Sequence, residues 1–181
     1  MKRFFVLLLA LVLGFGLVGC DEAEVTTVEN DEAEEGQESD DGSESEGEGE
    51  KEVYSIDETV SIDDLEISIE SATWGEQDEF SDLENDKVLR LELSIENNSD
   101  DSVYIDDTEF SLSDDEGNML EEYWGNDDAN MLSSDIKKGK KTKGVFEYDV
   151  PESDSYELYY EPDFSLDDIE VKWEIEKDDI E

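Results

Sequence analysis

Three acidic stretches carry the oxygen ligands that a calcium ion would need. They are SDDEGN, GNDDAN and SLDD, and their acidic residues are Asp114, Asp115, Glu116, Asp127, Asp128, Asp167 and Asp168. Calcium takes about six to eight such oxygens. None of the stretches fits the calcium-binding loop motif, because alignment on Gly117 puts Leu112 and Tyr123 at its first and last ligand positions. Tight turns also need Asp, Asn and Gly, so we interpret the stretches as turns, with weak Ca²⁺ binding as the alternative.

A basic stretch is the second candidate for binding. KKGKKTK contains the five lysines Lys137, Lys138, Lys140, Lys141 and Lys143. They could contact the phosphates of an envelope polymer such as teichoic acid, lipid headgroups or an acidic protein. The structural interpretation is a hairpin loop or strand edge, where lysines prevent edge-to-edge pairing and offset neighbouring carboxylates. We prefer that interpretation.

Two adjacent aromatic residues are the third candidate. EEYWGN places Tyr123 beside Trp124. Neighbouring residues of a strand point to opposite faces, so one ring of this pair can reach the surface and stack on a sugar or a peptide. Core filling is the commoner role of an aromatic residue. Trp173 alternates with Ile and Val and is predicted to lie in the core.

The overall charge excludes several classes of function. The chain has 58 Asp and Glu against 12 Lys and Arg, a formal net charge of −46 and no histidine. Such a surface repels nucleic acid, so we expect no nucleic-acid partner. Without histidine, the commonest general base and metal ligand is missing. No motif distinguishes a catalytic pair among the carboxylates. We therefore expect no enzyme, no catalytic residue and no cofactor, and a hydrolase using paired carboxylates is the less favoured alternative.

The single cysteine, Cys20, ends an apolar stretch. Lys2 and Arg3 precede the sixteen uncharged residues 4–19, which are fewer than the roughly 20 of a bilayer span but suit a signal peptide. LVGC at 17–20 resembles the lipobox of bacterial lipoproteins. That resemblance implies cleavage of a signal peptide, residues 1–19, and a lipid on the Cys20 thiol that anchors the chain to the membrane. An uncleaved membrane anchor is the alternative.

The segment after the cysteine has a different composition. Sixteen of the 32 residues 21–52 are Asp or Glu, and few are apolar. High charge with low hydrophobicity predicts disorder. We therefore predict a lipidated cysteine and a disordered acidic linker over residues 20–52, which would act as a spacer between the membrane and a domain at 53–181.

The candidate binding residues lie between segments with the alternation of β-strands. Apolar residues recur at every second position, as in Leu89, Leu91, Leu93 and Ile95, which predicts one buried and one exposed face. Turn-forming residues separate the predicted strands, which lie within 65–71, 88–97, 102–107, 110–112, 145–150, 156–162 and 169–175. Seven or eight short strands predict an all-β, antiparallel sandwich, with a small closed barrel as the alternative.

The order of these segments resembles a known family. The stretch LRLELSIENNSDDSVYIDDTEFSLSDDEGN and the later IKKGKKTKGVFEYDVPESDSYELYYEP look like the two halves of a telokin-like, immunoglobulin-fold domain of unknown function found in secreted lipoproteins, mostly of Gram-positive bacteria. The resemblance covers about residues 55–175. It implies an immunoglobulin-like sandwich and brings no catalytic residues, because no activity is established for that family.

Together these features predict a lipid-anchored protein on the extracellular face of the membrane of a Gram-positive bacterium. We expect a monomer with a non-enzymatic binding domain, whose partner is a cell-envelope polymer or a protein. A calcium- or carbohydrate-binding module is the alternative.

The excess of carboxylates is typical of secreted proteins of salt-loving bacteria, because salt screens the repulsion between them. We therefore expect a melting temperature that rises between low and molar NaCl. A flat or falling melting temperature would contradict a halophilic origin.

Overall fold

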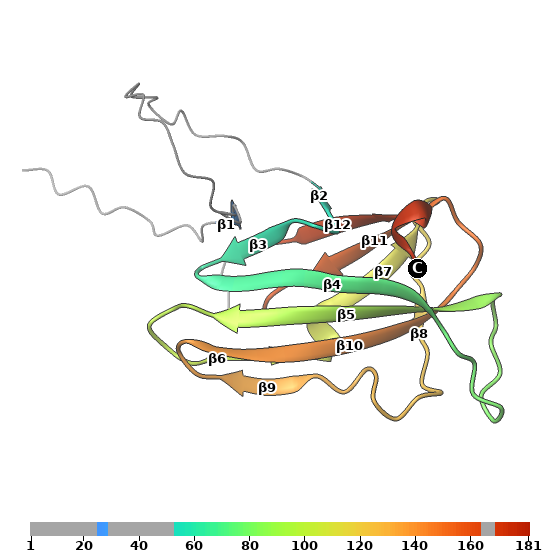
Figure 1. Cartoon of the computed structure of the whole chain (residues 1–181), viewed down its shortest axis with the longest axis horizontal. Helices are drawn as coiled ribbons and strands as arrows, with labels where there is room; N and C mark the ends of the chain where they lie inside the picture. Colours follow the sequence, from blue (N-terminus) through green and yellow to red (C-terminus); the bar gives the residue numbers. More distant parts are fainter. Residues whose placement is uncertain (1–24, 29–52, 164–168) are drawn as a thin grey trace, which may run out of the picture.

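Two β-sheets pack face to face in the computed structural model (Figure 1), which describes residues 25–28, 53–163 and 169–181. The predicted signal peptide, Cys20, most of the predicted linker and the turn with Asp167 and Asp168 lie outside the described residues. In the part of the chain that the structure describes, no helix is both long and apolar enough to cross a membrane.

The larger sheet has six strands in the order β1-β3-β4-β5-β10-β8. Their bounds are β1 Val25–Val28, β3 Thr59–Ile62, β4 Leu65–Gly75, β5 Lys87–Asn97, β10 Lys140–Val150 and β8 Glu121–Glu122. The second sheet has the order β2-β12-β11-β7, formed by Tyr54–Ser55, Val171–Glu176, Ser155–Tyr160 and Phe110–Asp114. A separate pair joins β6, Val103–Asp106, to β9, Ser133–Ile136. Two short 3₁₀ helices are η1, Asp107–Glu109, and η2, Lys177–Asp179.

The strand order is that of an immunoglobulin-like sandwich. The series β4-β5-β10-β8 corresponds in chain order to strands A, B, E and D of a constant-type domain, and β12-β11-β7 corresponds to G, F and C. The predicted sandwich is thus confirmed, and the alternative of a closed barrel is wrong. Among the described residues the strands number twelve, rather than seven or eight, because several pairings of only two to four residues are too short to show alternation.

The core follows the predicted alternation. Leu89, Leu91, Leu93 and Ile95 of β5 are fully buried, and so is Trp173 of β12. A bulge between Ile69 and Ser71 shifts the register of β4 against β5. The inward series of β4 consequently moves from Ile67 and Ile69 to Ala72.

A tyrosine fastens the connection between the two sheets. The Tyr156 hydroxyl, near the start of β11, donates a hydrogen bond to the Pro151 carbonyl oxygen at 2.5 Å. This is the tyrosine corner of immunoglobulin-like domains. With one cysteine in the chain, no disulfide within the chain joins the sheets, and the described sandwich depends on packing and hydrogen bonds.

One strand lies where the composition predicts disorder. Val25–Val28 forms β1 and pairs antiparallel with β3, Val25 facing Ile62 and Val28 facing Thr59. The prediction of disorder is therefore wrong for these four residues. Val25 packs against the core, and two valines flanking two threonines have high strand propensity. An average over 32 residues hides this short segment.

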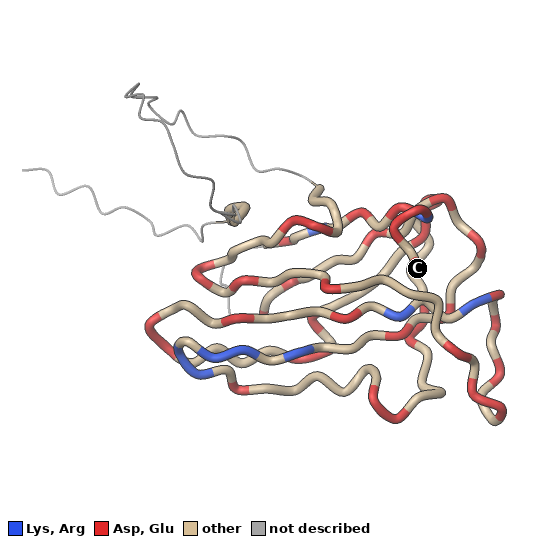
Figure 2. Tube along the Cα trace, viewed as in Figure 1, with Lys and Arg blue, Asp and Glu red and all other residues tan. Residues whose placement is uncertain are grey.

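Acidic residues are spread over the turns and along the strands of the sandwich (Figure 2), and most of those that the structure describes are exposed or half-buried. Four carboxylates within the described ranges are buried, namely Glu109, Asp114, Glu147 and Asp149. Buried charges require partners. Glu147 is paired with Arg90 of β5, and both Glu147 and Asp149 also accept hydrogen bonds from loops at one end of the sandwich, which form the candidate site.

Candidate functional site

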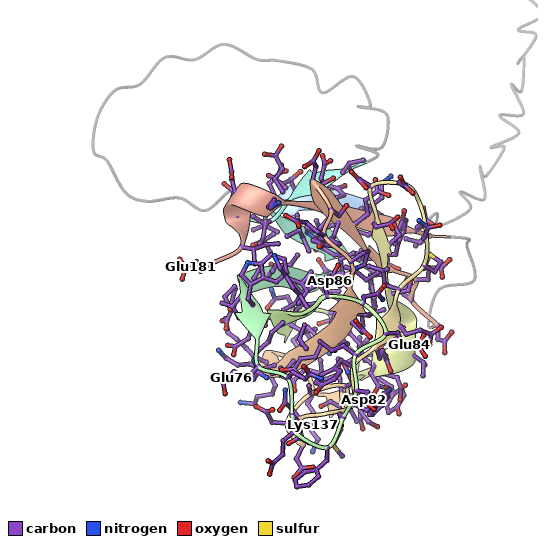
Figure 3. The ribbon with its side chains drawn as sticks, turned by 90° about the vertical axis from the view of Figure 1, so that its right-hand side faces the viewer. Glu76, Asp82, Glu84, Asp86, Lys137 and Glu181 are labelled. Atoms are coloured by element: carbon purple, nitrogen blue, oxygen red, sulfur yellow. The ribbon has the colours of Figure 1, made fainter. Side chains whose placement is uncertain are left out.

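The candidate site is a pair of loops tied to each other, residues 76–86 between β4 and β5 and residues 123–132 between β8 and β9. We refer to them as the loop pair. The backbone N–H of Asp78 donates to the Tyr123 hydroxyl oxygen at 2.7 Å, and the side-chain amide of Asn126 donates to the Glu76 carbonyl oxygen at 3.2 Å. Figure 3 looks at this end of the sandwich, where the first loop carries Glu76, Asp82, Glu84 and Asp86.

The second loop covers an ion pair on the outer face of the larger sheet. Arg90 of β5 and Glu147 of β10 are register partners, and Arg90 Nη1 lies 2.7 Å from Glu147 Oε1. Asn126 donates to the other oxygen of Glu147 at 2.7 Å, and Arg90 Nη2 lies 2.8 Å from Asp128 Oδ2. Glu147 is only 1% exposed. The hydrogen bond with Asp128 is the main reason that the pKa of Arg90 is raised, and the same bond lowers the pKa of Asp128.

Asn130 joins the end of this loop to β10. Its side-chain amide donates to the carbonyl oxygens of Tyr123 at 2.8 Å and Glu147 at 2.9 Å, and its side-chain oxygen accepts the Glu147 N–H at 2.9 Å. Its backbone N–H donates to the Val145 carbonyl oxygen at 2.8 Å. Asn130 has a φ of 52°, a conformation that asparagine tolerates better than most residues. The Asn130 side chain thus bonds both the N–H and the carbonyl oxygen of Glu147, as the backbone of a neighbouring strand would.

The first loop is held at its end by a second buried carboxylate. Asp149 of β10 accepts the backbone N–H of Glu84 at 2.5 Å and that of Asn85 at 3.1 Å. The side-chain amide of Asn85 donates to the Asp149 carbonyl oxygen at 3.2 Å. The two loops are therefore fixed to the same strand two residues apart.

The loop pair presents large apolar side chains to solvent. Phe80 is 87% exposed, Trp124 64% and Met131 71%. Tyr123, by contrast, is 4% exposed. A Cβ atom at Gly125 would lie 2.1 Å from the Tyr123 hydroxyl oxygen, so this close approach requires glycine. The structure thus places Tyr123 inside as an anchor and leaves Trp124 as the binding candidate.

Three of the five lysines of the basic stretch pair with carboxylates. Lys137 to Lys140 form the turn between β9 and β10, in which Gly139 has a φ of 66°.

Lys141 Nζ lies 2.6 Å from Glu96 Oε2, and Lys138 and Lys143 pair with Asp100 and Glu70. These hydrogen bonds with Glu96 and Glu70 raise the pKa of Lys141 and Lys143. The arrangement agrees with the structural interpretation, in which lysines offset neighbouring carboxylates.

The acidic stretch at Asp114 forms a turn. Asp114 Oδ1 accepts the backbone N–H groups of Glu116 at 3.0 Å and Asn118 at 2.8 Å, while Gly117 has a φ of 81°. Hydrogen bonding from the Asn118 side chain is the main reason that the pKa of Asp114 is lowered.

Asp128 of the second acidic stretch pairs with Arg90 instead. Within the described ranges, no three acidic side chains gather as a metal site would require. Calcium binding remains a prediction.

Other carboxylates line a depression of about 560 Å³ between β2 and β12. Its acidic residues are Asp57, Glu58, Glu174, Glu176 and Asp179. No basic side chain lies among its lining residues, and Ser55 there donates its hydroxyl to Asp57 and Glu58. The arrangement offers no activated nucleophile, and we assign no reaction to it.

The sequence does not predict the burial of Glu147, Asp149 and Glu109. Glu147 and Asp149 alternate with Phe146, Tyr148 and Val150, which predicts an exposed position. Glu109 is buried as well, and it accepts the N–H groups of Asp106 at 2.9 Å and Asp163 at 2.7 Å. Burial is the main reason that its pKa is raised. The sequence signal for the burial of Glu147 is Arg90, an arginine in the middle of a strand of a very acidic chain.

Comparisons with known proteins support the fold. The model of a family described as a domain of unknown function, DUF4352, matches residues 54–171. No curated protein matches the sequence significantly.

Several solved structures are similar. The Bacillus subtilis protein ycdA, described as a suspected lipoprotein, has a TM-score of 0.57 at 20% identity over 65% of this chain, which spans only 38% of ycdA. The yjhA protein of the same species has a TM-score of 0.54 at 19% identity over 68% of this chain and 99% of its own. The secreted protein MPT63 of Mycobacterium tuberculosis has 0.52 at 14% identity, over 67% and 95%. At these identities the likeness is one of fold.

The ion pair beneath the loop pair makes a prediction for stability. Replacing Arg90 by methionine leaves Glu147 buried without its cation, and we expect a loss of about 3–5 kcal/mol in the free energy of unfolding. Urea unfolding at pH 7 measures it, because urea does not screen charge.

The matched control is Lys141→Met, which removes an exposed ion pair of the same sheet. We expect its unfolding curve to stay close to that of the wild type. Equal shifts for the two variants would show that burial of Glu147 has no special cost.

Proposed function

This chain belongs to the DUF4352 family of domains of unknown function, and we infer that it acts as a non-enzymatic binding domain held at the outer surface of the cell membrane. The observation that carries the inference is Trp124, which is largely exposed on a loop fixed from below by Glu147 and Asn130. Aromatic side chains dominate binding energy at interfaces. A loop ordered before binding loses little conformational entropy on binding.

The charge around these apolar groups indicates the partner. Residues 76–86 contain six carboxylates and no basic residue, and the same loop carries Phe80. A partner that offers lysine or arginine beside apolar groups would meet both features, and a cation can also lie over the indole of Trp124. Phosphate polymers would be repelled here. Three of the five lysines that could attract them are paired with carboxylates. The proposed partner is therefore a basic surface of another protein.

A second candidate is carbohydrate binding, which the same exposed indole favours because sugar rings stack on aromatic faces. Calcium binding and hydrolysis have no comparable support among the described residues. The oxygens of Asp114 are engaged in a turn, and Asp128 is paired with Arg90.

The membrane anchor rests on separate support. The LVGC sequence at 17–20 resembles a lipobox, and Lys2 and Arg3 precede an apolar segment of signal-peptide length. Among proteins of similar fold, ycdA is described as a suspected lipoprotein and MPT63 as secreted. We propose that signal residues 1–19 are removed and that Cys20 carries the lipid of a Gram-positive surface lipoprotein. Two acyl chains suffice for stable attachment.

The anchor is tested by replacing Cys20 with serine in the full chain. We expect loss of metabolic lipid labelling and release of the protein into the medium, because the serine hydroxyl does not replace the thiol as the lipid acceptor. Unchanged labelling and membrane retention would show that the anchor lies elsewhere.

The binding surface is tested with a photo-reactive phenylalanine analogue placed at position 124 of the full chain on intact cells. We expect cross-linked products whose partner peptides are rich in lysine and arginine. The matched control is position 119, because Met119 is 60% exposed outside both loops.

Identical products from positions 124 and 119, or none from 124, would contradict the proposed surface. Products that contain glycan and no partner peptide would favour the carbohydrate alternative.

A further inference from the structure

The edge of the larger sheet next to β3 is occupied by a segment from far outside the domain predicted from the sequence. β1 pairs with β3 at all four of its residues, and 24 residues separate Val28 from Val53. Figure 1 shows β1 beside β3 at the upper left, away from the loops between β4 and β5 and before β9. Without β1, β3 would be a free edge, and free edges are sites where strands add.

The contacts of β1 make it a weakly held strand. Val25 faces the core as the partner of Ile62, which is fully buried. Thr26 and Thr27 are exposed, so backbone pairing and one valine provide most of the attachment. A strand of four residues held in this way can dock and detach without unfolding the sandwich, whose core lies in the longer strands.

We propose that the edge of β3 is a strand-docking site, that its occupant is Val25–Val28 of the same chain, and that docking sets the distance of the domain from the membrane. The last point rests on the proposed lipid at Cys20. When β1 is docked, only residues 20–24 separate the lipid from the domain, a reach of at most about 17 Å. When β1 is released, residues 20–52 separate them, and the limit rises to about 110 Å.

Docking changes the role of the acidic segment. Residues 29–52 then connect two points of one domain and add nothing to its distance from the membrane. They contain thirteen Asp or Glu and one Lys. When both ends of such a segment are held at an acidic domain, electrostatic repulsion adds to the unfavourable entropy of loop closure. The Debye length falls from about 30 Å at 0.01 M salt to about 3 Å at 1 M. Docking is therefore stronger in concentrated salt.

The docking step is tested without the anchor, by hydrogen exchange of the full chain carrying Cys20→Ser. Val25→Asp and Thr26→Asp each add one charge to β1, but only Val25 faces the core. We expect Val25→Asp to accelerate exchange of the β3 amides directed at β1 by more than about tenfold, and Thr26→Asp to leave it within about threefold. Exchange in the parent chain should slow as NaCl rises from 0.01 to 1 M. Equal effects of the two variants, or no response to salt, would overturn the docking site.

The identity of the occupant is tested with a disulfide. Thr26 and Ser61 are register partners on the outer face, so Thr26→Cys with Ser61→Cys, in the Cys20→Ser chain, should give an oxidised monomer on a non-reducing gel. A disulfide-linked dimer would show that a second copy supplies the strand and would overturn the proposal.

The distance is tested by neutron reflectometry of the lipidated full chain on a phosphatidylcholine and phosphatidylglycerol bilayer in 1 M NaCl. We expect the wild type and Thr26→Asp to lie against the bilayer and Val25→Asp to extend away from it. Identical profiles for all three would overturn the control of distance.

Failure of the Cys20→Ser chain to leave the membrane would overturn the anchor alone, because the exchange and disulfide experiments test the docking of β1 without the lipid.

Discussion

Glu147 lies on the outer face of β10, where alternation predicts an exposed side chain. It is buried there because Arg90 Nη1 lies 2.7 Å from one of its carboxylate oxygens and Asn126 donates a hydrogen bond to the other. The loop 123–132 can cover this part of the sheet only while that carboxylate has partners, since an unpaired buried charge is far more costly than a paired one. Asn130 and the tie between Tyr123 and Asp78 extend the same arrangement to the neighbouring loop. The exposed indole of Trp124 depends on all of these contacts.

The same rule governs the rest of a chain with a net charge of −46. Apolar residues fill the space between the sheets, and carboxylates stay at turns and outer faces unless specific donors meet them. Asp149 receives two backbone N–H groups, Asp114 closes its own turn, and Glu109 accepts two more backbone N–H groups from either side. At the surface, Lys141 and Lys143 pair with carboxylates of β5 and β4. The fold thus uses its few basic groups and amides to order connections, while the core supplies the stability.

Alternation with a period of two predicts the sandwich, the inward row from Leu89 to Ile95 and the burial of Trp173, because these depend on neighbours within one strand. The site could be predicted only in part. The sequence predicts that one ring of Tyr123 and Trp124 can reach the surface, but which of them is exposed depends on Gly125 and on a hydrogen bond from Asp78. Burial of Glu147 and Asp149 arises from loops that are distant in the sequence, and β1 is a short apolar segment inside an acidic region. Such non-local partners leave no periodic signal.

The central claim is that the loop pair is ordered before any partner binds. Amide hydrogen exchange of the free protein tests it at three donors within the site, the N–H groups of Asp78, Tyr123 and Asn130, which donate to the Tyr123 hydroxyl and to the Glu147 and Val145 carbonyls. We predict exchange as slow as that of the paired amides in the middle of β10. It should be much slower than exchange of the Lys140 N–H, which donates to the Lys137 carbonyl oxygen in the exposed turn where β10 begins. Exchange at all three amides as fast as at Lys140 would contradict a preformed surface.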